Sequence, residues 1–182
     1  MKENLKVNIL WLFLLLLGYG LISLLVSVGV LNLFHIQIIE QIGINIILAV
    51  GLNLIVGFSG QFSLGHAGFM AIGAYAAAII GSKSPTYGAF FGAMLLGAII
   101  AGLVALIVGI PTLRLKGDYL AVATLGVAEI IRILIVNGGS LTNGAAGILG
   151  IPSFTNWQMV YIFAVITTIL TLNFLRSPIG RL

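Results

Sequence analysis

Residues 51–69 read GLNLIVGFSGQFSLGHAGF, and this stretch decides how the chain can fold. Its flanks, residues 42–56 and 67–80, are strongly apolar, yet its centre concentrates glycines and polar side chains. Glycine weakens a helix, so the stretch is expected to break one. The backbone groups that such a break frees cannot face lipid, and they are tolerated at membrane depth only under a cover of protein or water. The stretch therefore indicates a pore, a substrate path or a helix junction.

We expect nine residues around this break to line or hinge such a path. They are Asn53, Gly57, Ser59, Gly60, Gln61, Ser63, Gly65, His66 and Gly68. A purely structural role stays open for the polar members of the set. For His66 it is the favoured interpretation, because a neutral imidazole can hydrogen-bond a backbone group that the break frees.

The composition places the chain in a bilayer. Hydrophobic residues make up 60% of the 182 residues and charged residues only 7%, whereas a soluble domain carries about 25% charged residues. The net charge of +4 comes from scattered basic residues, so nucleic acid is not an expected partner and membrane lipid is. The absence of cysteine excludes disulfides, thiol nucleophiles and thiolate metal sites.

Six apolar segments are candidates for membrane spans, since about 20 apolar residues cross the hydrocarbon core. They are residues 7–31, 38–57, 66–81, 88–110, 119–136 and 157–175, and Pro111 is expected to end the fourth. We therefore predict an all-α integral membrane protein. It is a polytopic helix bundle of about six transmembrane segments, with a broken or re-entrant stretch between the second and third. Residues 1–182 are expected to form a single transmembrane domain.

The basic residues predict the orientation of these spans. If the N-terminus is cytoplasmic, the inner face carries Lys2, Lys6, Arg114, Lys116, Arg176 and Arg181. The outer connections then carry only Lys83, and Arg132 lies near the outer end of a span. Because basic residues accumulate on the cytoplasmic side of a membrane, this distribution favours a multi-pass protein with a cytoplasmic N-terminus.

The fourth segment carries small residues at helical spacing. They are Gly88, Gly92, Ala93, Gly97, Ala101, Ala105 and Gly109. Small residues on one helix face let two backbones approach closely, so we expect a helix-packing face here.

Glu129 and Arg132 form an intramembrane polar pair in the fifth segment. The two residues are three positions apart and share a helix face. Glu129 lies ten residues past Tyr119, about 15 Å into the membrane at helical rise. Ionisable residues at that depth mark functional sites. The alternative, slightly favoured, is a pair that neutralises itself while Arg132 extends toward the interface.

The sequence offers little for enzymatic chemistry. It contains no G-x-x-x-x-G-K-[ST] stretch, so the chain is not its own ATPase. Its two histidines lack partners at metal-ligand spacing, and with four acidic residues no nucleophile, base and orienter set is suggested. We expect no enzyme activity, no catalytic residues, no metal site and no cofactor.

Three sequence blocks resemble the branched-chain amino acid ABC transporter permeases of the LivM type. They read GLNLIVGFSGQFSLGHAGFMAIGAYAAAI, LRLKGDYLAVATLGVAEIIRI and LTNGAAGILGIP, and they follow one another in family order over essentially the whole chain. The resemblance implies a permease subunit of a binding-protein-dependent ABC importer for leucine, isoleucine and valine in a bacterial or archaeal inner membrane. It also implies four kinds of contact: a second permease subunit, two cytoplasmic ATPase subunits, an extracytoplasmic substrate-binding protein and lipid.

The family pattern continues past an arginine-bearing R-S-x-I-G-R segment into a loop that docks on the ATPase, and then into further spans. The resemblance therefore implies that this chain corresponds to the N-terminal portion, incomplete at the C-terminus. The residues expected to face the ATPase are Arg114, Lys116, Asp118, Arg176, Gly180 and Arg181.

Three alternatives to this function remain open. Permeases of urea and short-amide importers resemble the same family and carry similar central blocks. An ATP-independent transporter or channel could use Glu129 as a coupling or filter residue, although ion relays usually need several carboxylates. A purely structural membrane subunit would tolerate alanine at the polar positions of the break.

Overall fold

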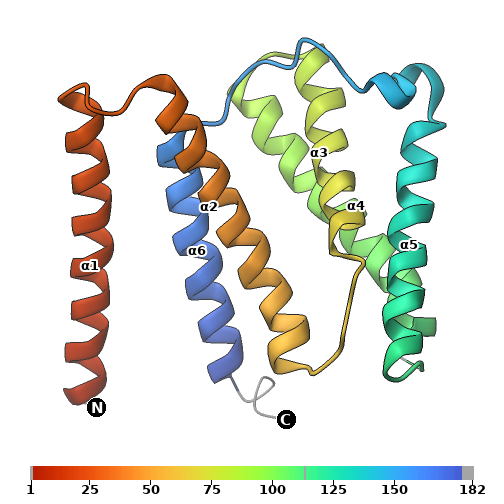
Figure 1. The fold of residues 1–182 in the computed structure, drawn as a ribbon, viewed down its shortest axis with the longest axis horizontal. Coiled ribbons are helices and arrows are strands. Elements are labelled where there is room, and N and C mark those ends of the chain that lie inside the picture. Colours follow the sequence, from red (N-terminus) through yellow and green to blue (C-terminus); the bar gives the residue numbers. More distant parts are fainter. Residues whose placement is uncertain (1, 113, 178–182) are drawn as a thin grey trace. The chain divides into compact units, whose positions relative to one another are not determined.

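The structure is a computed structural model, and it describes the backbone of residues 2–112 and 114–177. Six α-helices occupy this part of the chain (Figure 1). They are α1 (Lys2–Ser27), α2 (Leu33–Asn53), α3 (His66–Lys83), α4 (Tyr87–Thr112), α5 (Asp118–Val136) and α6 (Trp157–Arg176). A π-helical turn, Leu54–Phe58, continues α2, and short 3-10 turns at Gly139–Leu141 and Gly144–Ala146 lie between α5 and α6. The described residues form no strand, which confirms the prediction of an all-α membrane protein.

Four of the helical segments in the described residues are long and apolar enough to cross a membrane. They are Leu33–Phe58, Tyr87–Thr112, Asp118–Val136 and Trp157–Arg176. The apolar part of α1, Phe13–Ser27, is shorter. Helix α3 has 18 residues, many of which are alanine or glycine, and it ends in Ser82 and Lys83. The structure has a helix at each of the six predicted segments. The chain is a multi-pass membrane protein, and its helices differ in how apolar they are.

The position of Pro111 corrects one predicted boundary. The proline lies inside α4, which ends one residue later at Thr112. The Thr112 hydroxyl donates to the carbonyl oxygens of Val108 at 2.9 Å and Gly109 at 3.1 Å. The bond to Gly109 satisfies one of the four carbonyl groups that the helix end leaves without an intrahelical donor. Pro111 itself removes only the N–H that would bond the Ile107 carbonyl oxygen, a loss confined to the end of the helix.

The chain divides into two compact units, Met1–Ala49 with Thr155–Leu182, and Val50–Phe154. In the first unit the Tyr161 hydroxyl on α6 donates to the Leu15 carbonyl oxygen on α1 at 2.7 Å. The Tyr19 ring lies 5.2 Å from that of Trp157 and 5.7 Å from that of Tyr161. These contacts join α1 to α6 through polar and aromatic groups. The predicted single domain over residues 1–182 stays a prediction.

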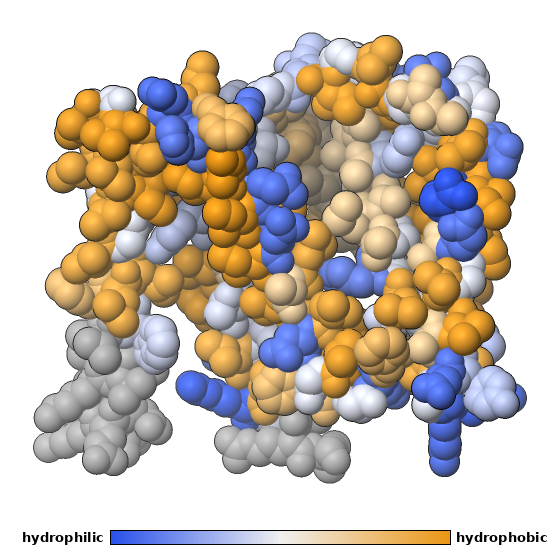
Figure 2. Space-filling view, viewed as in Figure 1, coloured by the Kyte–Doolittle hydropathy of each residue, from blue (hydrophilic) through white to orange (hydrophobic). Residues whose placement is uncertain are grey.

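In the second unit, α3 packs against both α4 and α5. Ala93 on α4 is fully buried. A Cβ atom at Gly97 would lie 3.1 Å from the Gly73 Cα and 3.2 Å from the Ala76 Cβ, both on α3. Small residues thus allow the two backbones to approach closely. Elsewhere most large apolar side chains are exposed, and they dominate the face shown in Figure 2, as lipid-facing helices require.

Gly97→Val is expected to lower the free energy of unfolding by about 1–3 kcal/mol, because the new side chain overpacks the contact between α3 and α4. Gly102→Val on the same helix is the matched control, since nothing lies within 4 Å of a Cβ atom there. Thermal unfolding of both variants in detergent, followed by circular dichroism, measures the difference. Equal losses in the two variants would contradict the packing described for Gly97.

Candidate functional site

The predicted helix break is present. Helix α2 loosens into the π-turn Leu54–Phe58, and residues 59–65 form no helix before α3 begins at His66. Gly60 has φ +63°, a left-handed conformation that glycine adopts without steric cost. The π-turn satisfies the first freed amides: the N–H groups of Ser59 and Gln61 donate to the carbonyl oxygens of Leu54 and Ile55, each at 3.3 Å.

After the π-turn the chain packs against α5, and a side chain of α5 accepts a hydrogen bond from the backbone amide of Leu64. The Leu64 N–H donates to the Thr124 Oγ1 at 3.0 Å, and that hydroxyl donates to the Ala121 carbonyl oxygen at 3.0 Å. Thr124 lies six residues into α5, or about 9 Å along the helix at 1.5 Å per residue. Helix α3 therefore starts at membrane depth, and Figure 1 shows the connecting segment running from the π-turn to this start.

Two glycines make this close approach possible. A Cβ atom at Gly65 would lie 3.0 Å from the Thr124 carbonyl oxygen, and one at Gly68 would lie 2.8 Å from the Ala128 Cα. Both glycines are buried. Glycine is required at these positions to let the start of α3 rest on the backbone of α5.

The polar residues of the break differ in their surroundings. Asn53 extends its side-chain amide into the space that a Cβ atom at Gly57 would fill. Ser59 and Gly60 are exposed, whereas Gln61 and Ser63 are half-buried. The His66 ring lies against Gly51, and its Nε2 atom is buried without a hydrogen-bond partner among the described residues. The structure thus shows no backbone partner for that nitrogen, and the role of His66 stays a prediction.

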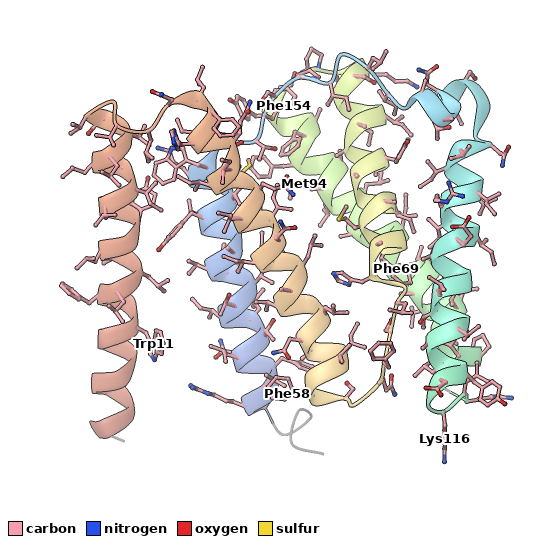
Figure 3. The ribbon with its side chains drawn as sticks, in the orientation of Figure 1. Trp11, Phe58, Phe69, Met94, Lys116 and Phe154 are labelled. Carbon is pink, nitrogen blue, oxygen red and sulfur yellow. The ribbon has the colours of Figure 1, made fainter. Side chains whose placement is uncertain are left out.

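A small apolar cavity lies beside the break. Its volume is about 130 Å³, and its walls come from α3, α4 and α5. The lining residues are Gly65, Phe69, Ala105, Val108, Gly109, Thr112, Thr124 and Val127. Phe69 lies in the first turn of α3 (Figure 3). The two threonine hydroxyls both donate to backbone carbonyl oxygens of their own helices.

A larger cavity of about 560 Å³ lies at the opposite end of α3. It is lined by Ile79, Ser82, Lys83, Ser140, Leu141, Asn143, Ile148 and Leu149. The glycine-rich connection that forms one wall is held by side chains: Thr142 Oγ1 donates to the Ile135 carbonyl oxygen at 2.6 Å, and Asn143 Nδ2 donates to that of Gly147 at 2.8 Å. Lys83 is the one charged residue in this lining.

Glu129 and Arg132 form the predicted ion pair within α5. Arg132 Nε donates to Glu129 Oε2 at 2.9 Å, and Arg132 Nη2 donates to Glu129 Oε1 at 2.6 Å. Both side chains are exposed on the helix surface. The pair forms within one helix, while its functional role stays a prediction.

The predicted packing face on α4 is divided. Ala93 and Gly97 are buried, and Gly97 packs against α3 of the same chain. Of the remainder, Gly88, Gly92 and Ala105 are exposed, and Ala101 and Gly109 are half-buried. Contact of these residues with another subunit stays a prediction.

The residues predicted to face an ATPase lie at helix ends. Arg114 and Lys116 are exposed between α4 and α5, and Asp118 is exposed as the first residue of α5. Lys116 points away from the helices in Figure 3. Within the second unit this end is opposite to Lys83, because α3, α4 and α5 alternate in direction. Arg176 is exposed in the last turn of α6, whereas Gly180 and Arg181 lie outside the described residues.

Sequence reasoning missed Thr124 and Ala128, the α5 residues on which the break rests. The available signal was weak: Thr124 is a hydroxyl residue within an otherwise apolar helix, where threonine commonly bonds its own backbone. Its partner Leu64 is 60 residues away in the chain, and no local pattern connects the two.

Thr124→Val is expected to leave the Leu64 amide without its acceptor, at a cost of about 1–3 kcal/mol in local stability. Hydrogen exchange of the peptide that contains Leu64 should therefore become faster. Thr124→Ser is the matched control, because it keeps the hydroxyl group. If both variants exchange at the wild-type rate, the bond does not hold the break in place.

Comparison with known proteins identifies the family. A family model described as the permease component of branched-chain amino acid transport systems matches residues 34–182. The chain is 43% identical over 66 residues to the high-affinity branched-chain amino acid transport system permease protein LivM of Salmonella typhimurium, covering 36% of this chain and 16% of that protein. It is 52% identical over 60 residues to LivM of Escherichia coli, covering 31% of this chain and 14% of that protein.

These alignments cover far less than two thirds of either relative. No solved structure matches the chain. The family model, however, spans most of the chain and includes the break, the ion pair and the glycine-rich connection. The chain therefore belongs to the family of permease components of branched-chain amino acid transport systems.

Proposed function

We propose that this chain is a transmembrane permease subunit of a binding-protein-dependent ABC importer for leucine, isoleucine and valine. The observation that carries the proposal is the family match over residues 34–182. The two LivM relatives support it, since both are named as permeases of high-affinity branched-chain amino acid transport systems. In this function the chain is a transporter component rather than an enzyme, and ATP hydrolysis resides in partner subunits.

The partners are a second permease subunit, two cytoplasmic ATPase subunits and an extracytoplasmic binding protein. The distribution of charge favours their placement. Arg114 and Lys116 lie at one end of the second unit and Lys83 lies at the other. Because basic residues accumulate on the cytoplasmic side, the ATPase subunits contact the end with Arg114 and Lys116, and the N-terminus is cytoplasmic. The binding protein docks at the opposite end, beside the 560 Å³ cavity.

The break supplies the moving part of this transporter. Helix α3 is fixed to α5 by the bond between Leu64 and Thr124 and by the close approach at Gly68. Residues 59–63 connect this pair of helices to α2 with few hydrogen bonds, so they form the hinge. Rocking of the α3 and α5 pair about residues 59–63 opens the path alternately to the two sides.

The runner-up function is a permease for urea or short amides within the same family of importers. Urea has no ionised group and no aliphatic side chain, so it needs neither an ion pair nor an apolar surface in its path. An ATP-independent transporter is less well supported, because ion relays use chains of carboxylates and α5 carries one carboxylate within its span, Glu129.

Uptake of labelled leucine into membrane vesicles that hold this chain with its partner subunits is expected to require both ATP and the chain. Excess unlabelled urea should leave the uptake unchanged, whereas excess valine should compete. Vesicles without the chain are the control. Urea uptake without leucine uptake would favour the runner-up, and flux without ATP would contradict the importer.

A further inference from the structure

The ion pair of α5 occupies an unusual position for two charged groups. Glu129 lies eleven residues past the start of α5 at Asp118, about 16 Å along the helix at 1.5 Å per residue. The side chains of Arg132 and Glu129 are nevertheless 66% and 50% exposed. Charged groups at that depth are expensive against lipid and normally face a bundle interior or a water-filled cavity. This face of α5 is therefore directed at protein or water rather than at lipid.

The remainder of the face is aliphatic. Val122 and Leu125 precede Glu129 by seven and four residues, so helical periodicity places them on the same side of α5. They are 68% and 52% exposed. Ala128 and Ile131 of α5 pack against Gly68 of α3. Ile131 lies on the far side of α5 from Val122, whereas Ala128 borders the open face beside Leu125 and Arg132. The open face of α5 thus offers an anion, a cation and an aliphatic surface in succession along one helix.

Neither of the two cavities described above offers this combination. The 130 Å³ cavity has no charged lining residue, and both its threonine hydroxyls already donate to backbone carbonyl oxygens. The 560 Å³ cavity has Lys83 but no carboxylate. An amino acid carries an ammonium and a carboxylate on one carbon and needs a partner for each when water is removed. Among the described residues, Glu129 and Arg132 are the ion pair that supplies both.

We propose that the open face of α5 is a binding site for the substrate zwitterion along the translocation path. Arg132 binds the α-carboxylate, Glu129 binds the α-ammonium group, and the branched side chain lies along Leu125 and Val122. Guanidinium and carboxylate groups form bidentate, charge-assisted bonds, so the two substrate bonds replace the two bonds that the resting pair makes with itself. The inference rests on the proposed function, and it assigns that function to a particular helix face.

The test compares removal of the charges with their reversal. In proteoliposomes that hold the complete transporter and its binding protein, Glu129→Gln and Arg132→Gln are each expected to lower ATP-dependent leucine uptake about tenfold or more. The reversed pair, Glu129→Arg with Arg132→Glu, can re-form an ion pair at the same spacing, yet its charges meet the substrate in the wrong order. Uptake by the reversed pair is therefore expected to stay as low as in the single variants.

A second measurement does not depend on the binding protein or on transport. Leucine at millimolar concentration should raise the midpoint of thermal unfolding of the purified transporter, because a ligand stabilises the state that it binds. N-acetylleucine and leucinamide, which each lack one of the two charges, should raise it less, and urea should not raise it. The reversed pair should show no shift with leucine.

The outcomes separate the inference from the function on which it rests. If the reversed pair restores leucine uptake and the thermal shift, the charges only neutralise each other and the inference is wrong, while the importer stands. If the reversed pair loses a partner subunit during purification, the face is a subunit contact, which also overturns the inference. If the wild type shows a leucine shift that the reversed pair lacks but no ATP-dependent uptake, the site stands and the importer fails.

Discussion

Backbone hydrogen bonding at membrane depth is the constraint on which the second unit depends. The chain loses helical bonds over residues 59–65, and each amide freed there needs an acceptor that lipid does not provide. The π-turn accepts the first amides, and the Thr124 hydroxyl accepts that of Leu64. The bond between Leu64 and Thr124 is possible only because Gly65 and Gly68 let the backbone of α3 approach α5. The break between α2 and α3 therefore constrains which residues α5 can carry where it contacts α3.

This arrangement gives α5 two different faces. The face toward α3 carries Thr124, Ala128 and Ile131, which contact the break and the first turn of α3. The open face carries the bidentate pair Glu129 and Arg132 together with exposed aliphatic side chains. Because α3 and α5 are joined along the first face, a displacement of α3 at the proposed hinge would also displace the charges on the second. The proposed hinge and the proposed binding site would then move together without a direct contact between them.

The sequence predicted the helices and the break well, because both depend on local composition. Apolar runs of about 20 residues have few alternatives to a membrane helix, and a cluster of glycine and polar residues within them interrupts it. Long-range partners were not predictable: nothing near Leu64 indicates Thr124. Spacing alone also could not show which of the small residues of α4 pack against a neighbouring helix. A four-residue repeat drifts by about 40° at each step of a 3.6-residue helix, so Ala93 and Gly97 are buried while Ala105, two steps past Gly97, is exposed.

In the site proposed on α5, the intrahelical ion pair would also allow the ligand to be released. A lone charge at membrane depth would hold a counterion tightly, because the only alternative is an unpaired charge in a medium of low dielectric constant. In α5 the alternative is already present, since Glu129 and Arg132 bond each other at 2.6 and 2.9 Å when no ligand is bound. Binding in the proposed site would exchange the one intrahelical ion pair for two ion pairs with the substrate, with zero net charge before and after. Such an exchange would favour zwitterions over ions and over neutral amides.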